Sequence, residues 1–366
     1  MPRSANAASP AMEPHAELAQ LADRLRDALL SVVWRQWRVL GAGAASRSAR
    51  GRASDAGTPP SRPLQSLVDP EALVLVSLLL LDHERRLGDL LHDWGARNAD
   101  LLSVQRVKNL MADYPAPVRV LLTRRVAWFA AVARDVGKDL RWRSLAQAWP
   151  GSPGSWPDHV EDHAPDSPGA RAQGVHAPAA ASTKTRATRA RLVADATLML
   201  RLRLGLGVGV KSDLIAVLLA RGTVSATVRD LAEATGYTVA AVRRAADDLA
   251  AARLIASRDG PPASYLVSYE AWAPLLGMAA AAPRWANWHN RFQFATAFLQ
   301  WAATARPRPL SDYAFGAHGR ELLEQHRAAF AHDPMAVWSA HTPIHDWRAF
   351  VGQSVRSLAT WMDEMA

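Results

Sequence analysis

Residues 227–255, TVRDLAEATGYTVAAVRRAADDLAAARLI, carry the strongest structural signal in this chain, because they contain two adjacent helix patterns. Thr227 is placed to cap a helix, and Asp230 three residues later completes the spacing of a capping box. Gly236 can adopt the left-handed conformation that ends such a helix. Thr238 can then cap the next helix. The stretch therefore predicts two helices joined by a tight turn.

The flanking residues extend this pattern to three helices and a hairpin. Residues 211–222 have helical apolar periodicity and end at a glycine. Residues 254–258 and 264–267 are strand-like runs, and the residues between them, DGPPA at 259–263, are typical of a hairpin turn. The third predicted helix, which begins after Thr238, has the size of a helix that fits the major groove of DNA.

Helical periodicity assigns an inner and an outer face to the second and third helices. The inner positions, with the residues that close the core behind them, are Val228, Leu231, Ala232, Val242, Ala246, Leu249, Leu254 and Ile255. The outer face of the third helix carries Val239, Ala240, Arg243, Arg244 and, one turn later, Asp247 and Asp248. The N-terminal part of a helix in the major groove reaches the base edges. Arg243 and Arg244 are therefore the candidate base-contacting donors.

This segment resembles the winged helix-turn-helix domains of bacterial transcriptional regulators of the ArsR and MarR type. The matching positions are the turn at 236–238, Val242, Leu249 and the pair at 254–255, and the match covers about a sixth of the chain. The resemblance implies a DNA-binding regulator that forms a homodimer. The residues that it implies at double-stranded DNA are Thr238, Val239, Ala240, Arg243 and Arg244, with Arg258 near the DNA backbone.

A second interpretation has the same fold and a different partner. Winged helices also dock proteins, and a fold does not imply a function. Val239 and Ala240 are apolar where DNA-reading helices often carry polar side chains, and the hairpin tip at Pro261 and Pro262 has no Lys or Arg. These features leave open the alternative of a protein-interaction scaffold, for instance a component of a defence or toxin-control system whose winged helix binds a protein.

The composition narrows the protein class. The chain has 366 residues, of which 49% are hydrophobic and 21% charged, as in globular proteins. The absence of cysteine excludes disulfides and thiolate metal sites, and is typical of a reducing cytoplasm. Arginine replaces lysine almost throughout, which indicates a high-GC bacterial source. We expect a cytoplasmic bacterial protein.

The net charge of +9 favours a polyanionic partner. Between residues 184 and 221, eight Lys and Arg residues face only Asp195 and Asp213, and eight minus two leaves six positive charges. Such a segment can contact phosphates, or its arginines can simply form the solvent-exposed face of a helix. Both interpretations remain open from the sequence.

The chain is predicted to be mainly α, with helical regions on both sides of the central winged domain. Two segments rich in Gly, Ala, Ser and Pro have the composition of disordered linkers. The predicted segments are an N-terminal amphipathic helix (12–40), a basic linker (41–63), a helical domain (64–149), a second linker (150–185), the winged helix-turn-helix domain (186–269) and a tryptophan-rich helical region (270–366).

Several helices are predicted outside the winged domain. The first has an apolar stripe of Leu18, Leu21, Leu25, Leu29, Val32 and Val33. Asp69 and Pro70 form a helix start, because Asp caps and Pro fits the first helical position. Ser311 is a candidate cap in the C-terminal region. Residues 192–204 fit either an alternating strand or a helix, and helix is favoured.

Signals of catalysis, metal binding and membrane insertion are weak. The apolar run at 72–81 is half the length that crosses a bilayer, about twenty residues. The glycines at 205–209 lack the phosphate-loop glycine before Lys211, where Val210 stands. The pairs His159 with His163 and His341 with His345 lack a helical scaffold that would orient them as ligands. We expect no enzyme activity, no cofactor, no metal and no membrane partner.

Overall fold

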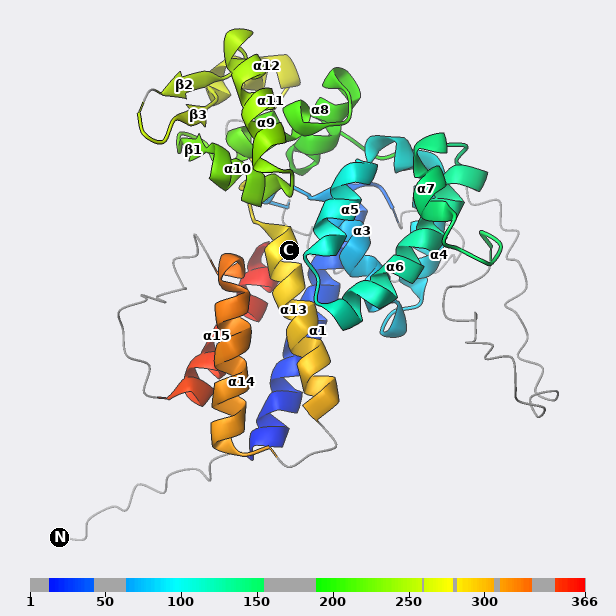
Figure 1. Ribbon diagram of the computed structural model, residues 1–366, viewed down its shortest axis with the longest axis vertical. Helices are drawn as coiled ribbons and strands as arrows, with labels where there is room; N and C mark the ends of the chain where they lie inside the picture. The colour runs from blue at the N-terminus through cyan, green and yellow to red at the C-terminus, as the bar shows by residue number, and fades with distance from the viewer. Residues whose placement is uncertain are drawn as a thin grey trace, which may run out of the picture. The chain divides into compact units, whose positions relative to one another are not determined.

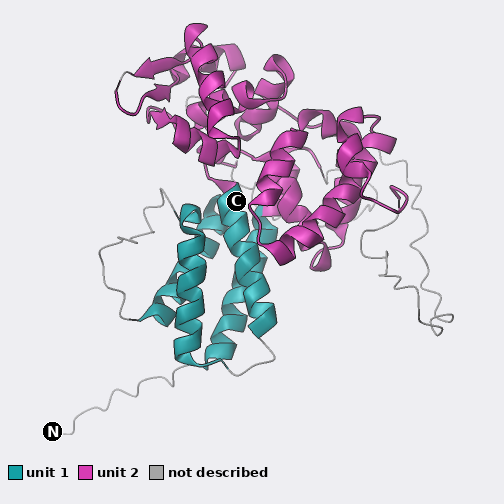
Figure 2. Ribbon diagram, in the orientation of Figure 1, with its two compact units in different colours: residues 1–32, 289–366 teal, residues 33–288 magenta. Residues whose placement is uncertain are grey.

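The computed structural model describes residues 13–42, 64–154, 189–258, 260–278, 282–305, 310–330 and 346–365. In this part of the chain the protein is mainly helical, with one three-stranded antiparallel sheet (Figure 1). Two compact units are present, residues 1–32 with 289–366 and residues 33–288 (Figure 2). None of the helices described is both long and apolar enough to cross a bilayer.

The first unit is built from helices that are far apart in the sequence. It contains most of α1 (Pro14–Val39) and α13 (Trp288–Ala305), together with α14 (Asp312–Gln325), the 3-10 turn η6 (Arg327–Ala329) and α15 (Trp347–Met365). The predicted stripe of α1 is buried throughout. The cap predicted at Ser311 is confirmed, because its side chain accepts a hydrogen bond from the backbone N–H of Ala314. Helix pairing in this unit therefore follows the apolar stripes in the sequence.

The second unit begins with a helical segment, residues 64–154. Its elements are α3 (Pro70–Leu79), η1 (Leu80–Asp82), α4 (Arg86–Asn98), η2 (Ala99–Leu101), α5 (Val104–Ala112), α6 (Ala116–Ala131), the π-helical turn η3 (Val132–Val136), η4 (Leu140–Trp142) and α7 (Arg143–Ala146). The start predicted at Asp69 and Pro70 is confirmed, since the carboxylate of Asp69 caps the backbone N–H of Ala72 at 3.1 Å. Helix α3 is apolar and almost entirely buried, which makes it the central helix of the segment.

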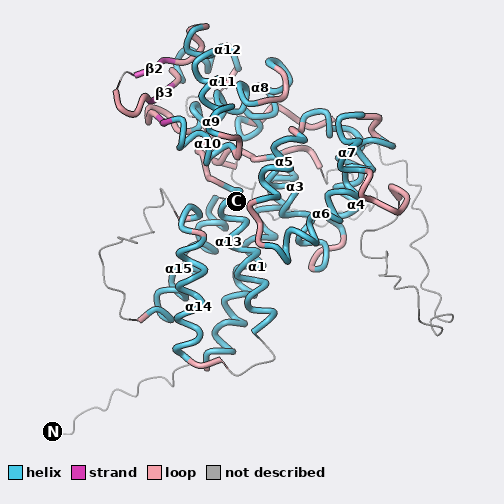
Figure 3. The backbone as a smooth tube through the Cα atoms, viewed as in Figure 1, coloured by secondary structure: helices cyan, strands magenta, loops and turns pink. Residues whose placement is uncertain are grey.

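The rest of the second unit combines helices with the sheet (Figure 3). Its elements are η5 (Asp195–Thr197), α8 (Leu198–Leu206), α9 (Val210–Ala220), β1 (Ala226–Thr227), α10 (Val228–Thr235), α11 (Val239–Ala251), β2 (Ala256–Arg258), β3 (Ser264–Leu266) and α12 (Tyr269–Leu276). The helix favoured for residues 192–204 forms over 195–204, which lie in η5 and α8, whereas 192–194 are not helical. The strand order is β1-β3-β2, with both pairings antiparallel. Strand β1 was not predicted, because two residues are too few to give an alternating pattern.

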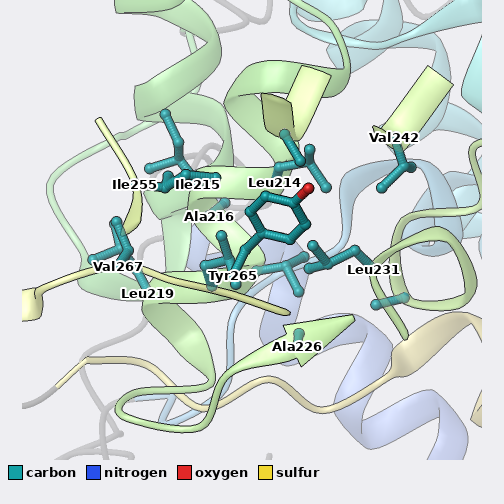
Figure 4. Close-up of a cluster of buried hydrophobic side chains, with 14 of the residues drawn as sticks. Leu214, Ile215, Ala216, Leu219, Ala226, Leu231, Val242, Ile255, Tyr265 and Val267 are labelled. Atoms are coloured by element: carbon teal, nitrogen blue, oxygen red, sulfur yellow. The ribbon is translucent and has the colours of Figure 1, made fainter. Parts of the chain in front are cut away.

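One apolar core joins these helices to the sheet (Figure 4). The aromatic ring of Tyr265 from β3 lies among aliphatic side chains of α9, α10 and α11 in this view. Leu214, Leu231 and Val242, one from each helix, have no exposed surface. The inner faces predicted for the second and third helices are thus confirmed, and helix burial rather than the short strands supplies most of the core.

The prediction that Leu254 closes this core is wrong. Its side chain is 40% exposed, whereas the neighbouring Ile255 is buried. Arg253 adopts a left-handed conformation with φ of 58°, so the chain turns sharply after α11 ends. Consecutive side chains of the extended chain that follows point to opposite sides. Only one of the two apolar residues can therefore face inward.

Candidate functional site

The segment Thr227 to Gly236 folds as its sequence predicts. The backbone N–H of Thr227 donates to the carboxylate of Asp230 at 2.9 Å, and the backbone N–H of Asp230 donates to Oγ1 of Thr227 at 3.2 Å. Gly236 ends α10 in the left-handed conformation, with φ of 70°. The capping box and the glycine stop are therefore confirmed, and they fix both ends of an eight-residue helix.

Helix α11 has one buried face and one exposed face. Oγ1 of Thr238 accepts a hydrogen bond from the backbone N–H of Ala241 at 3.3 Å and caps the helix start, as predicted. Val242, Ala246 and Leu249 are buried in the core. The opposite side is exposed at Thr238, Val239, Ala240, Arg243 and Arg244, which we call the outer face of α11. The structure thus brings five of the six predicted site residues together on one surface.

The charges on the outer face are unevenly partnered. Arg243 and Arg244 are exposed and form no ion pair within the part of the chain that the structure describes. The carboxylate of Asp247 accepts a hydrogen bond from the hydroxyl of Tyr265 at 2.7 Å. The carboxylate of Asp248 lies 2.8 Å from Nζ of Lys211. The two acidic side chains of α11 are therefore engaged by the protein, whereas the two guanidinium groups remain available to a partner.

The sixth predicted residue, Arg258, lies on a different element. It is in β2, whose three residues are all exposed, and it is opposite Ser264 of β3 in the sheet. Its guanidinium forms no ion pair among the described residues. Arg258 is thus accessible on the hairpin, separately from the outer face of α11.

In the basic segment at 184–221, one arginine fits neither interpretation of the sequence, and contact of the other cations with phosphates stays a prediction. Lys184 and Arg186 lie outside the described residues. Arg203 is buried, so this cation neither contacts phosphate nor solvates a helix surface. Arg189 pairs with Asp100 at 2.7 Å, and Lys211 pairs with Asp248 as above. Counting charges along the sequence overstates the positive field here, because part of the charge is neutralised by acidic residues from elsewhere in the chain.

Arg203 belongs to a group of five charged residues that sequence analysis did not identify. Asp69, Glu71, Arg106, Arg203 and Asp213 have side chains with 0% exposed surface, and we call them the buried ion cluster. The only signals in the sequence are charged residues inside strongly apolar helices, such as Arg203 in LMLRLRLGL and Asp213 before LIAVLLA. Such residues are rarely buried unless they are paired. Their partners lie too far along the chain to be recognised from spacing.

Two guanidinium groups connect the three carboxylates of the cluster. Arg106 donates from Nη1 and Nη2 to Asp69 at 2.5 and 2.6 Å, and from Nη1 to Glu71 at 2.6 Å. Arg203 donates to Glu71 at 2.6 and 3.0 Å and to Asp213 at 2.7 and 2.8 Å. Glu71 thus bridges both arginines. The cluster joins the helical segment, through α3 and α5, to α8 and α9.

The arginines keep the central carboxylate ionised. Burial alone would raise the pKa of Glu71, but the neighbouring guanidinium groups of Arg203 and Arg106 hold that pKa below its ordinary value. The backbone N–H of Ser103 also donates to this carboxylate, at 2.7 Å. A buried carboxylate with these partners is stabilised as an anion. Because no atom of its side chain reaches solvent, we assign it a structural role.

The cluster also touches the turn that precedes α11. We call Thr235, Gly236 and Tyr237 the α10–α11 corner. Nε of Arg106 donates to the carbonyl oxygen of Thr235 at 2.6 Å, and Nδ2 of Asn109 donates to that of Gly236 at 2.9 Å. The corner is therefore held by α5, an element of the helical segment.

The weaker sequence signals considered above give no additional site among the described residues. The described residues contain no group of three or more His, Asp or Glu that could hold a metal. Both histidine pairs that the sequence analysis judged too weak to be metal ligands, His159 with His163 and His341 with His345, lie outside the described residues. Of the glycines at 205–209, Gly205 lies in the last turn of α8, whereas Gly207, with φ of 88°, and Gly209 lie in the connection to α9.

Comparisons with protein-family models, with curated proteins and with solved structures find no match. The function is therefore inferred from the residues themselves. The best-defined candidate surface is the outer face of α11, which combines exposure, unpaired positive charge and a rigid helical frame.

Proposed function

We propose that the protein is a DNA-binding transcriptional regulator, in which the segment predicted as a winged helix-turn-helix domain (186–269) binds double-stranded DNA and α11 enters the major groove. The observation that carries this proposal is the pair Arg243 and Arg244, exposed and without ion pairs among the described residues, on a 13-residue helix whose opposite face is buried. The order α9, α10, α11, β2, β3 supports it, with the β2–β3 hairpin as the wing.

The chemistry of the outer face defines what it can recognise. A guanidinium group can donate two hydrogen bonds to O6 and N7 of guanine in the major groove. Val239 is 47% exposed, and an apolar side chain at this position can contact the C5 methyl group of thymine. We infer that Arg243 or Arg244 reads guanine and that Val239 and Ala240 face thymine. Arg258, on the wing, is assigned to a phosphate.

A second candidate function rests on the same apolar residues. Val239 and Ala240 expose hydrocarbon at the start of α11, where a protein partner could also bury it. Under this proposal the protein is an interaction scaffold and the outer face of α11 docks another protein. The two functions differ in their dependence on salt, because phosphate contacts release counterions and a mainly apolar interface does not.

Selection from a random duplex library, followed by a salt titration of the selected sequence, tests the proposal. We expect an enriched motif containing both guanine and thymine. If the protein binds as the homodimer that its resemblance implies, the motif should be an inverted repeat with half-sites about 10 base pairs apart. Failure to enrich any sequence, with only weak salt-dependent binding to all duplexes, would favour the scaffold function.

A further inference from the structure

The carbonyl groups of Thr235 and Gly236, the first two residues of the α10–α11 corner, are bound by side chains from another part of the protein. The final carbonyls of a helix have no partner within the helix and are bound instead by side chains, water or other groups. Here Arg106 and Asn109, which are three residues apart on α5, donate to the carbonyls of Thr235 and Gly236 at 2.6 and 2.9 Å. Helix α5 thus completes the C-terminus of α10.

The same corner is confined by shape and by a hydrogen bond from its third residue. A Cβ atom at Gly236 would overlap the side chain of Leu110, so the corner approaches α5 as closely as glycine permits. The hydroxyl of Tyr237 donates to Asp213 at 2.9 Å and lies 3.1 Å from Oγ of Ser103, the N-cap residue of α5. Every residue of the corner therefore contacts α5 or its cap.

Arg106 is itself held in place by the buried ion cluster. Its two terminal nitrogens are bound by Asp69 and Glu71, at the start of α3, which leaves Nε directed at Thr235. A planar guanidinium with several fixed partners has little rotational freedom. Arg106 therefore fixes the end of α10 relative to the start of α3.

Helix α11 begins three residues after Gly236, so the geometry of the corner sets the direction of its axis. We propose that Arg106 and Asn109 are positioning residues for the outer face of α11. On this proposal the helical segment at 64–154 determines how Arg243 and Arg244 are presented, without touching DNA itself. This inference rests on the proposed DNA-binding function and adds to it a control that lies outside the winged domain.

The experiment uses Asn109→Ala in the full chain. Replacing Arg106 would leave Asp69 and Glu71 buried without their cation and could prevent folding. Asn109 is only half-buried, and alanine removes its donor to Gly236 together with the Oδ1 atom that accepts from the side chain of Gln105 within α5. The matched control is Gln147→Ala, which changes an exposed side-chain amide of the same helical segment that has no hydrogen bond among the described residues.

Two measurements are made on each variant. Hydrogen exchange of a peptide covering residues 232–243 reports on the corner and the start of α11. Affinities for the selected duplex and for a random duplex of equal length separate base contacts from phosphate contacts. For Asn109→Ala we expect faster exchange, a roughly three- to tenfold loss of affinity for the selected duplex, and random-duplex affinity within about twofold of the parent. Gln147→Ala should change none of these.

The outcomes separate the positioning role from the proposed function. Unchanged exchange in Asn109→Ala would show that α5 does not hold the corner, and the proposal would be wrong. Faster exchange with unchanged affinity, or an equal loss for both duplexes, would overturn the positioning role and leave DNA binding intact. A parent chain that enriches no duplex overturns the DNA proposal before any variant is compared, and the positioning role falls with it.

Discussion

Nε of Arg106 lies 2.6 Å from the carbonyl oxygen of Thr235, a residue 129 positions later in the chain. This hydrogen bond joins α5 to the end of α10. The rest of the Arg106 side chain is bound to Asp69 and Glu71, so one arginine connects three helices in a site without water-exposed atoms. An arrangement of this kind is sensitive to the removal of any partner, because the remaining charge stays buried.

The arginines of the outer face should account for specific binding. Arg243→Ala combined with Arg244→Ala should weaken binding to the selected duplex at least tenfold, because each bidentate guanine contact contributes about 1–3 kcal/mol. The slope of log affinity against log salt should also fall by about 0.9 for each phosphate that the protein no longer neutralises. Fluorescence anisotropy at several salt concentrations measures both.

Arg85→Ala combined with Arg143→Ala is the control, since it removes the same charge from exposed arginines of the helical segment. Its affinity for the selected duplex should stay close to that of the parent. Equal losses in the two double variants would mean that only net charge matters, and would contradict base reading by α11.

The contact proposed between Val239 and thymine can be tested by removing single methyl groups from the DNA. Replacing a contacted thymine of the selected duplex by deoxyuridine removes only the C5 methyl, and should weaken binding about fourfold. The loss should disappear in Val239→Ser, whose shorter polar side chain makes no such contact. Deoxyuridine that has no effect at any thymine would rule out this assignment.

The buried ion cluster should make a large contribution to stability. Glu71→Gln keeps the size of the side chain but leaves Arg106 and Arg203 short of a shared anion, and should cost about 3–5 kcal/mol in the free energy of unfolding. Arg189→Ala is the comparison, because it breaks an exposed pair, expected to contribute about 0–1 kcal/mol. Urea unfolding followed by circular dichroism measures both, and equal costs would contradict the assigned role.

Glu71 should also make stability depend on pH. Its pKa in the folded protein is lowered, so the unfolded chain binds the proton more readily. The stabilisation is complete above the ordinary glutamate pKa of about 4.3 and is lost as the pH falls through the lowered value in the folded protein. Urea unfolding between about pH 7 and about pH 3 should show a smaller acid loss in Glu71→Gln. Parallel curves for parent and variant would contradict the assignment.

Alanine substitutions at Gly236 and Gly222 test whether α5 confines the α10–α11 corner. Both have positive φ, 70° and 66°, so alanine at either position should cost about 1–2 kcal/mol from backbone strain. Only at Gly236 would the added Cβ overlap Leu110; at Gly222 it meets open space. Gly236→Ala should therefore destabilise the protein by at least about 1 kcal/mol more in urea unfolding. Equal effects would show that the corner can move away from α5.

Local features of this protein follow from residues that are close in the sequence. The cap at Thr227, the stop at Gly236 and the start at Thr238 are each set by backbone groups within four residues, so their patterns predict them correctly. The stripe of Val242, Ala246 and Leu249 is equally local, because helical period alone places these side chains on one face. For the same reason, the exposure of Arg243 and Arg244 could be predicted without the tertiary structure.

The tertiary structure alone decided which charges are available. Arg203 and Arg243 are indistinguishable as arginines on predicted helices, yet one is buried against Glu71 and Asp213 and the other is exposed. The carboxylates that pair with Arg203 are 10 and 132 residues away in the sequence. Only folding brings them within hydrogen-bond distance of the guanidinium group. Short strands and sharp turns also depend on the tertiary structure. Strand β1 forms only because β3 lies beside it, and Leu254 is exposed because Arg253 turns the chain. Hydrogen bonds and ion pairs act over a few ångströms, so contacts distant in sequence exist only once the core has brought their elements together.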